Sequence, residues 1–559
     1  MRFVLVCLLA LALLVVGFAL LRGPADGLPL APHPRTLGGR PQGHVYTSAA
    51  EEPADVHPLT CRGPAARNLI LRVTHDTLLD RDGRDGSLRG ALATSYRLHD
   101  DGHGCDYPLR AGVRFCDGSP LTADDVLLPF ELHRGGHLEL GFVGDAMQHV
   151  RSAEVVDGTL RVRFAGDHFD AASVVGENWL VPCRAWLLER IRERLDAGES
   201  MPPVASRRFA DLVAQLRRET GPGTGPYSMY ADGTSLWRAR QRVTMVRHEQ
   251  SWHRQVRPGS WNFAAMRVRF RDQAAARNAL LRGELDWYSG QDLDALLTAH
   301  QQVRRDYVRH RYDYPQLGVY RIVWNARHAP FDRPEVRRAL AGLVDHQALQ
   351  QRFGDLEPAR GHAKPYADAL QGCPTSTFDP AATRAELRRA GFDAGAGTPL
   401  RLRLLALSGT EVLEAIVDLV RDAARTAGVQ LEVRERALTP LLAELRAGAW
   451  DGLLVLESFL PSQDPHRFLH SQGTNNHGGF ADPALDALLE QARRQPDPEL
   501  RNELWRQAHA RSAELAPAAL VAHPRAAVLM HRRVRGCQPG RFGIRPEWGW
   551  VAPEQQVSR

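Results

Sequence analysis

Two pairs of histidines come closest to a metal-binding pattern in this chain of 559 residues. His248 and His253 bracket a glutamate in a stretch that resembles a zinc-protease helix. Their five-residue spacing places them about 140° apart on a helix, so they cannot bind one ion together. His470 and His477 flank the polar run 473–476, for which a surface loop is favoured over a metal site. We therefore predict no resident metal.

Motifs for covalent catalysis and for phosphate binding are missing from the sequence. There is no G-x-S-x-G elbow for an activated serine, and no histidine and aspartate lie in a context that indicates a triad. The glycine-rich run 221–226 lacks the Lys-Ser/Thr ending of a phosphate-binding loop and is better explained as a turn. A binding role is therefore favoured over catalysis. We predict no catalytic residue and no cofactor, and a hydrolase stays the less favoured alternative.

The composition is that of a globular protein with a mixed-sign surface. Hydrophobic residues make up 43% and charged residues 24%, and the length predicts two or three lobes rather than one core. Lys364 is the single lysine, and arginines run beside acids, as in residues 81–85. No basic stripe is interleaved with aromatics, and the most basic stretch, 531–545, is interpreted as a solvated edge. We predict no nucleic-acid partner.

The N-terminus carries the signal for export. Residues 3–21 form an uninterrupted apolar run of 19 between Arg2 and Arg22, nearly long enough to span a bilayer as a helix. Residues 23–25 make a poor cleavage site, so an uncleaved membrane anchor is favoured over a cleavable signal peptide for residues 1–22. The Pro- and Gly-rich stretch 23–43 is predicted to be a tether. Cys7 lies too early in the run for lipid attachment.

Six cysteines follow the apolar run, and none shows the C-x-x-C spacing of a zinc or redox site. Their pairing is open from sequence, so structural thiols or one or two disulfides are both expected. They are Cys61, Cys105, Cys116, Cys183, Cys373 and Cys537.

From residue 400 onward the periodicity predicts an α/β unit. Residues 400–407 are strand-like, and Ser408 and Glu411 have the spacing of a capping box that starts a helix. Apolar residues then recur at three- and four-residue steps until Gly428, after which residues 429–433 alternate as a strand. A second helix over 439–447 leads to a strand at 453–456. The pattern predicts a partly parallel sheet.

The first half favours antiparallel β structure with shorter helices. Residues 160–164 alternate apolar and polar side chains, and residues 107–115 indicate a hairpin around Ala111-Gly112. The fold class is thus mixed α/β.

Residues 109–126, with the sequence LRAGVRFCDGSPLTADDV, resemble the signature of the family 5 extracellular solute-binding proteins, the periplasmic receptors for oligopeptides, dipeptides, nickel complexes, haem and some sugars. Cys116 stands where the family has histidine. Thr122 can cap the following helix, whose first turn holds Asp124 and Asp125. Further landmarks appear in the family's order and cover roughly residues 45–535. They are Gly223 to Tyr227, Leu281 to Asp286, Asn325, Pro330 to Asp332, Val336 to Leu340, Asp345, Phe378 to Pro380, Ala390 to Phe392, Asp464-Pro465, Asn475-Asn476, Asp482-Pro483 and Asp486.

The resemblance implies a three-lobed, type II periplasmic binding protein-like fold with a ligand cleft between two α/β lobes. Lobe I would comprise residues 44–76, 206–311 and 526–559, the β-rich lobe II residues 77–205, and lobe III residues 312–525. Ligand would be enclosed between lobes I and III by hinge closure. The implied protein is a periplasmic, monomeric receptor that presents a peptide or peptide-like solute to the permease of an ABC importer. Alternatives are an envelope sensor or chaperone, and a receptor for a metal chelate, haem or sugar.

The resemblance also suggests ligand-contacting positions. Glu51, Glu52 and Asp55 follow the expected first strand, Trp287 and Tyr288 follow the G-E-L-D step, and Glu457, Ser458, Phe459 and Asn475 belong to the third lobe. Peptide-binding relatives place an aspartate for the peptide's α-ammonium three residues before the D-P step, where this chain has Pro461. Glu457, four residues earlier, could replace this aspartate only if the loop follows a different path. Recognition of a free peptide N-terminus is therefore in doubt, and a modified peptide or another solute gains weight.

Overall fold

The computed structural model describes residues 43–557, apart from 64–65, 84, 167, 232, 291–292, 313–317, 364–367, 374, 460–463, 538 and 541–542. The predicted anchor and tether, Cys7, Lys364 and Pro461 lie outside the described residues. Within the described part, no helix combines the length and the apolar character needed to cross a membrane.

A large eight-stranded sheet gathers strands from three distant parts of the chain. Its order is β11-β12-β13-β1-β14-β22-β15, with β8 paired to β12. The strand β1 runs parallel to β13 and β14, whereas β22 is antiparallel to β14 and β15. The strands are β1 (Val45–Ala50), β8 (Tyr227–Ser228), β11 (Trp237–Arg238), β12 (Arg242–Arg247), β13 (Ala265–Phe270), β14 (Trp287–Tyr288), β15 (Tyr307–Tyr312) and β22 (Ala526–His531).

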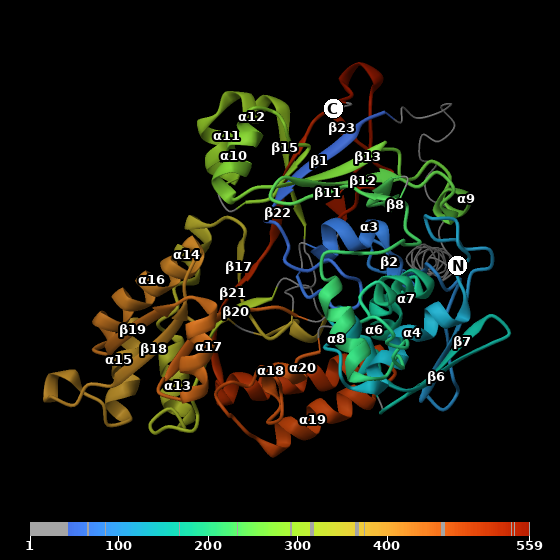
Figure 1. Ribbon diagram of the computed structural model, residues 1–559. Coiled ribbons are helices and arrows are strands. Elements are labelled where there is room, and N and C mark those ends of the chain that lie inside the picture. Colours follow the sequence, from blue (N-terminus) through green and yellow to red (C-terminus); the bar gives the residue numbers. More distant parts are fainter. Residues whose placement is uncertain are drawn as a thin grey trace, which may run out of the picture.

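Helices α10, α11 and α12 gather at one end of this sheet, and α9 lies at the other (Figure 1). Their bounds are α9 (Trp252–Val256), α10 (Gln273–Leu281), α11 (Leu293–Ala299) and α12 (Gln301–Asp306).

A six-stranded sheet, in the order β17-β21-β16-β20-β18-β19, forms the second core. β18 runs parallel to β19 and β20, and the remaining pairs are antiparallel, which confirms the predicted partly parallel sheet. The strands are β16 (Val319–Trp324), β17 (Leu356–Pro358), β18 (Arg401–Leu407), β19 (Gln430–Arg436), β20 (Gly452–Glu457) and β21 (Ala518–Pro524). The helices of this part are α13 (Pro334–Ala341), α14 (His346–Arg352), α15 (Pro380–Arg389), α16 (Glu411–Ala427), α17 (Leu438–Ala447), α18 (His466–Leu469), α19 (Pro483–Arg494) and α20 (Pro498–Leu515).

Helix α16 ends as predicted but begins differently. Its apolar stripe, including Ile416 and Val420, is buried against the six-stranded sheet, and Gly428 ends the helix with a left-handed φ of 76°. The predicted Ser408 cap is wrong, because the N-cap is Thr410, whose hydroxyl accepts a hydrogen bond from the Leu413 amide at 3.2 Å. The Ser408 amide instead donates to the Arg436 carbonyl, which extends the β18–β19 pairing.

The third layer is an antiparallel sheet in the order β4-β5-β7-β6, covered by helices. In β7 every second side chain is buried, which confirms the predicted alternation. The elements are β4 (Arg97–Leu98), β5 (Gly104–Pro108), β6 (Val150–Val156), β7 (Thr159–Phe164), α4 (Ala123–Gly135), α5 (Phe142–Met147), α6 (Ala171–Asn178), α7 (Arg184–Arg192) and α8 (Arg207–Val213).

The hairpin predicted around Ala111-Gly112 is wrong. Strand β5 pairs with β4 and β7, and the chain reverses later, where the Phe115 amide donates to the Ser119 carbonyl at 2.9 Å around Gly118 (φ 88°). Both sites carry a glycine with positive φ, so sequence alone could not choose between them. The Thr122 cap is confirmed, with Asp125 completing a capping box at the start of α4.

Shorter elements complete the described part of the chain. They are η1 (Arg67–Leu71), α3 (Arg72–Thr74), β2 (Leu79–Arg81), β3 (Leu88–Gly90), η2 (Ala214–Leu216), β9 (Tyr230–Ala231), β10 (Thr234–Ser235), η3 (Asp368–Leu370), η4 (Ala394–Ala396), β23 (Val534–Arg535), β24 (Pro539–Gly540), β25 (Gly543–Ile544), η5 (Pro546–Trp548), β26 (Trp550–Val551) and η6 (Pro553–Gln555). The six cysteines within the described ranges are all free thiols, and four of them are buried.

The two main sheets are joined where the chain leaves one sheet for the other. The first crossing runs from β15 to β16, and the second is Arg525, between β21 and β22. Asp355 lies beside both crossings, because its carboxylate pairs with Arg309 and Arg311 of β15 and its carbonyl accepts from the Arg525 amide at 2.7 Å. The predicted lobe boundaries stay a prediction.

The α16 cap provides a direct test of the helix start. We expect Thr410→Ala to lower the free energy of unfolding by about 1 kcal/mol, because the Leu413 amide loses its acceptor. Ser408→Ala is the matched control and should change it by less than about 0.5 kcal/mol. Denaturant unfolding of the two variants measures the difference, and a larger effect of Ser408→Ala would contradict the assignment.

Candidate functional site

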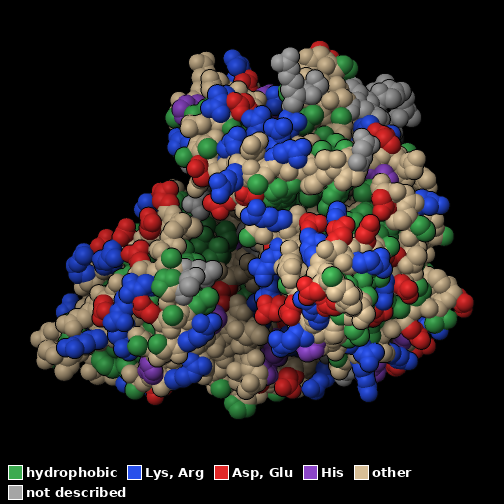
Figure 2. Space-filling view, viewed as in Figure 1, with side chains coloured by type: hydrophobic (Ala, Val, Ile, Leu, Met, Phe, Trp, Pro, Cys, Tyr) green, Lys and Arg blue, Asp and Glu red, His purple; other side chains and the backbone are tan. Residues whose placement is uncertain are grey.

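A cavity of about 240 Å³ lies between the large sheet and the segment that contains η1 and α3. The sheet contributes Tyr46, Ser48, Met245, Met266 and Trp287 to its wall. Figure 2 shows that the face in view is hollowed near its centre, between the part at lower left, which holds the six-stranded sheet, and the rest of the molecule. The cavity itself is lined by residues of the large-sheet and four-stranded-sheet parts and by the C-terminal run 543–546.

The glycine-rich turn 221–226 positions the opposite wall. The Gly225 amide donates to the Thr74 carbonyl at 3.0 Å, and a Cβ atom at Gly223 would lie 1.8 Å from that carbonyl oxygen. Thr224 between them accepts a hydrogen bond from the Asp76 amide at 3.3 Å. The two glycines are therefore required for the turn to approach the backbone at the end of α3, and the turn in this way holds Asp76 in place.

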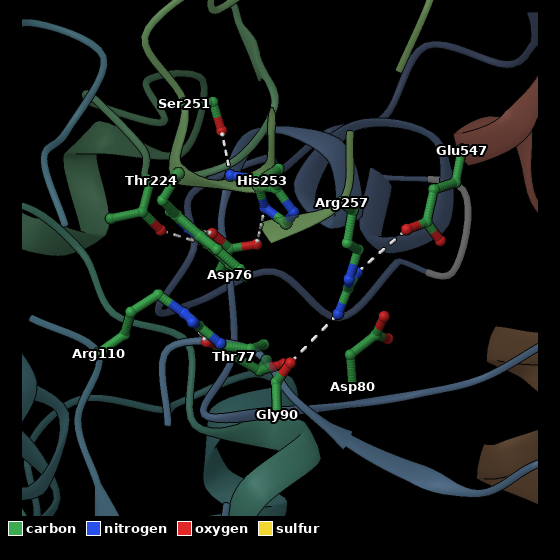
Figure 3. Close-up of polar contacts among 12 residues, drawn as sticks. Asp76, Thr77, Asp80, Gly90, Arg110, Thr224, Ser251, His253, Arg257 and Glu547 are labelled. Atoms are coloured by element: carbon green, nitrogen blue, oxygen red, sulfur yellow. Dashed lines mark hydrogen bonds and ion pairs between the residues drawn. The ribbon is translucent and has the colours of Figure 1, made fainter. Parts of the chain in front are cut away.

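Asp76 is a buried carboxylate paired with His253 (Figure 3). Its two oxygens lie 2.9 Å from His253 Nε2 and 2.9 Å from Trp252 Nε1, and the His253 and Trp252 rings stack with centroids 3.8 Å apart. Burial alone would raise the pKa of Asp76, but the hydrogen bonds and the charge of His253 outweigh it and lower the pKa. Asp76 therefore stays ionised inside the protein.

Ion pairs link the rim of the cavity to the C-terminal segment. Asp80 accepts from Arg89 at 2.8 Å and from Arg545 at 2.6 Å. Glu547 accepts from Arg89 at 2.8 Å and from Arg257 at 3.1 Å. Burial acts to raise the pKa of both acids, but the arginines prevail, so both pKa values are lowered. The network joins residues 80–89 to the chain's last segment.

Of the predicted ligand-contacting pair on β14, one residue faces the cavity. Successive side chains of a strand point to opposite faces, so Trp287 lines the cavity whereas Tyr288 packs into the core beneath α10 and α11. Glu51, Glu52 and Asp55 lie outside the cavity lining. Glu52 accepts from the Arg240 amide at 3.0 Å, Asp55 accepts from the His57 amide at 2.9 Å, and Glu51 is exposed.

Glu457 and Asn475 meet in a buried network at the end of β20. One oxygen of Glu457 pairs with the guanidinium of Arg321, which is 2% exposed, and the other accepts from Asn475 Nδ2 at 2.7 Å and lies 2.8 Å from His477 Nε2. Burial acts to raise the pKa of Glu457, but Arg321 and His477 outweigh this effect. The pKa is therefore lowered, and the acid is ionised. Both of its oxygens are thus occupied by protein groups.

The other positions suggested near β20 do not join that network. Phe459 is buried against Phe468, and Ser458 is exposed. His470 lies 3.4 Å from Glu490, away from His477, and no cluster of three or more potential metal ligands occurs among the described residues.

Sequence reasoning missed Asp76, Asp80, Arg72 and Arg257 at the cavity. The one local signal was the G-T-G-P-Y turn, which contacts Asp76 through Thr224. The partners of these residues lie far away in the chain, as with Asp76 and His253, which are 177 residues apart. Spacing rules that operate within one helix or strand cannot detect such pairs.

Another contact joins the loop before α6 to α19 and α20. The loop before α6 places Phe169 on α20, with the Arg501 guanidinium 4.0 Å above its ring and Trp505 in edge contact. The Phe169 amide also donates to the Arg493 carbonyl at 2.9 Å. The docking of Phe169 joins the four-stranded-sheet part to the six-stranded-sheet part. Burial raises the pKa of neighbouring Asp170 to about 7, with Glu177 and Asp464 adding to the effect.

Comparison with known proteins gives consistent matches over most of the chain. Residues 87–480 match the model for bacterial extracellular solute-binding proteins, family 5 Middle. "Protein XP55" of Streptomyces lividans is 26% identical over 83% of this chain and 80% of its own length. The probable D,D-dipeptide-binding periplasmic protein DdpA of Escherichia coli is 22% identical over 76% of this chain and 78% of its own.

A solved structure shares the fold. The oligopeptide-binding protein AppA of Bacillus subtilis, in complex with a nonapeptide, superposes with a TM-score of 0.72 at 19% identity, covering 92% of this chain and all of that chain. The expected mixed α/β fold of the type II periplasmic binding-protein kind is therefore confirmed.

The Arg321–Glu457 pair yields a stability prediction. We expect Arg321→Met to lower the free energy of unfolding by about 3–5 kcal/mol, because it leaves a buried carboxylate without its cation. The double variant Arg321→Met with Glu457→Met should lose less than the single variant, since both charges are then gone. Denaturant unfolding measures both, and equal losses would contradict a role for the buried charge.

Asp170 yields a pH-dependent prediction. Its pKa rises from 3.8 in the unfolded chain to about 7 in the folded one, so folding becomes costlier as pH rises from about 4 to 7, and the cost is constant above that. We expect Asp170→Asn to raise the free energy of unfolding by on the order of 1–2 kcal/mol at pH 8 and to have little effect at pH 4. Exposed Glu154→Gln is the control and should show no such pH dependence.

Proposed function

Because the chain belongs to the bacterial extracellular solute-binding proteins of family 5, we propose that it binds a peptide or peptide-like solute outside the cytoplasm and delivers it to the permease of an ABC importer. Similar proteins include a dipeptide-binding protein of Pseudomonas aeruginosa, 23% identical over 82% of this chain, and the probable D,D-dipeptide-binding protein described above. The observation that carries the proposal is the cavity against the large sheet, which combines apolar walls with fixed charges as ligand pockets do.

The arrangement of the cavity supports binding rather than chemistry. Asp76 and His253 form the acid–histidine half of a triad, but the nearby Ser251 hydroxyl accepts from the His253 backbone amide at 3.4 Å and caps α9. Acyl transfer needs a nucleophile within hydrogen-bond reach of the imidazole. We therefore propose that the solute leaves the protein chemically unchanged.

The two chain crossings support a hinge. Rotation of the six-stranded-sheet part about the β15–β16 and β21–β22 links would widen or close the recess without disturbing either sheet. In this proposal the Trp287 side of the cavity provides one face of the binding site. Glu457 and Asn475 would act through their network, by shaping the facing end of β20. Glu51, Glu52, Asp55, Ser458 and Phe459 stay candidates for contacts in a ligand-bound arrangement.

The location and assembly of the protein complete the proposal. The family is extracytoplasmic, so we place the protein in the periplasm or cell envelope, held to the membrane by residues 1–22 if these are retained, and acting as a monomer. Transporter genes beside its own would support uptake rather than a sensor or chaperone role.

Ligand-dependent stabilisation tests the proposed function. We expect a tripeptide pool to raise the Tm of the purified full-length protein, since a ligand that binds only the folded state stabilises it. Trp287→Ala should lose most of the shift, whereas Trp237→Ala, in β11 and outside the cavity lining, should keep it. Native mass spectrometry should reveal a co-purifying solute of unchanged mass. No shift with any pool, or a cleaved solute, would contradict the proposal.

A further inference from the structure

The charges that line the cavity are unbalanced. Five arginines contribute to its wall, against three carboxylates. The arginines are Arg67, Arg72, Arg257, Arg267 and Arg545, and the carboxylates are Asp76, Asp80 and Glu177. A partly closed cavity with excess positive charge attracts anions, because the low dielectric of its walls strengthens the interaction.

Each of the three carboxylates already accepts hydrogen bonds from protein groups. Asp76 accepts from Trp252 and pairs with His253, and Asp80 accepts from Arg89 and Arg545. Glu177 is paired with Arg81, whose Nε lies 2.9 Å from Oε1. Within the described lining of the cavity, each acid is therefore already paired with protein donors, so an ammonium group of a ligand would gain less there than beside an unpaired carboxylate.

Arg72 differs from the other arginines of the wall. It lies on α3, its side chain is exposed, and its guanidinium makes no hydrogen bond or ion pair with the described part of the chain, although it lies close enough to Asp80 to lower the pKa of that acid. By contrast, Arg257 and Arg545 are held by Glu547 and Asp80. Arg72 thus lines the cavity with an exposed guanidinium that no described residue holds by a hydrogen bond or ion pair.

Arg267 adds to the positive potential from the sheet side. Burial lowers the pKa of Arg267. Repulsion from Arg242 on the paired strand β12 and from Arg269, two residues along β13, lowers it further. The apolar part of the wall lies beside these charges and includes Met245, Met266 and Trp287. A ligand that suits this wall carries an anionic group next to an apolar one.

We propose that the cavity selects a carboxylate-bearing peptide-like solute, that Arg72 is the residue that binds this carboxylate, and that a free amino terminus is not required. Arg72 can form two parallel N–H···O bonds to a carboxylate, an arrangement that is both stronger and more selective than a neutral hydrogen bond. The inference rests on the proposed function, since it names the class of solute that the same site takes.

Four tripeptide pools with identical side chains and different ends test the inference. They carry a free amine and free acid, an acetylated amine and free acid, a free amine and amide, or an acetylated amine and amide. We expect both free-acid pools, including the acetylated one, to raise the Tm of the full-length protein, and the amide pools to require at least about tenfold higher concentrations. Titration calorimetry on the best-binding pool measures the same difference as Kd.

Variants at position 72 separate binding from stability. We expect Arg72→Gln to weaken binding of the free-acid pools about tenfold or more and to leave binding of the amide pools unchanged. Arg72→Lys should bind with intermediate affinity, because it keeps the charge but not the planar fork. Arg151→Gln, an equal charge change at an exposed position of β6, should behave like the wild type. The unliganded Tm of each variant verifies folding.

The outcomes distinguish the two proposals. Amide pools that bind as tightly as acids, a requirement for the free amine, or an Arg72→Gln variant that binds acids like the wild type would overturn the carboxylate inference while leaving peptide binding intact. If none of the four pools binds to any variant, the proposed peptide function fails and the inference fails with it.

Discussion

Two neighbouring chain crossings join the two main sheets, and this connection constrains how the two halves of the molecule are arranged. β15 continues into β16, and β21 continues into β22, so each sheet holds one strand from each crossing. These two neighbouring links are the proposed hinge between the two halves. Asp355 reinforces this place by pairing with two arginines of β15 and by accepting from the Arg525 amide.

Buried charge is the second feature that organises the molecule. Asp76, Glu457 and Asp464 are nearly inaccessible, and each is paired with a cation or a histidine that comes from another element. Removing such acids from water is unfavourable unless partners replace the lost hydration. The pairs therefore require particular elements to meet: Glu457 and Arg321 join two adjacent strands of one sheet, whereas Asp76 and Asp464 each join separate elements.

The cavity and the Glu457 network lie in different parts of the molecule. The cavity is lined by the large-sheet and four-stranded-sheet parts, whereas the Glu457 network lies at the end of β20 in the six-stranded sheet. The Phe169 loop connects the four-stranded-sheet part to the six-stranded-sheet part, because it packs on α20. On the six-stranded-sheet side, the buried charge of Glu457 is paired with Arg321 within the protein itself.

Sequence by itself determined the parts whose signals are local. The unit β18–α16–β19, the stop at Gly428, the alternation of β7 and the Thr122 cap follow from periodicity and from residues within one turn, and the ordered family motifs follow from the same kind of linear pattern. It placed the α16 cap two residues too early and chose the wrong glycine for the reversal near Gly118, because neighbouring residues with equal propensity compete there.

Tertiary structure alone decided the site. Whether Trp287 or Tyr288 faces the cavity depends on which side of the large sheet is covered by α10 and α11, and Glu457 could not be recognised as a network acid before Arg321 of the adjacent strand was placed beside it. Asp76 meets His253 across 177 residues of chain. A charge removed from water requires a complementary partner, and the fold supplies that partner from a distant part of the chain. The spacing of residues along the sequence therefore does not predict which side chains pair.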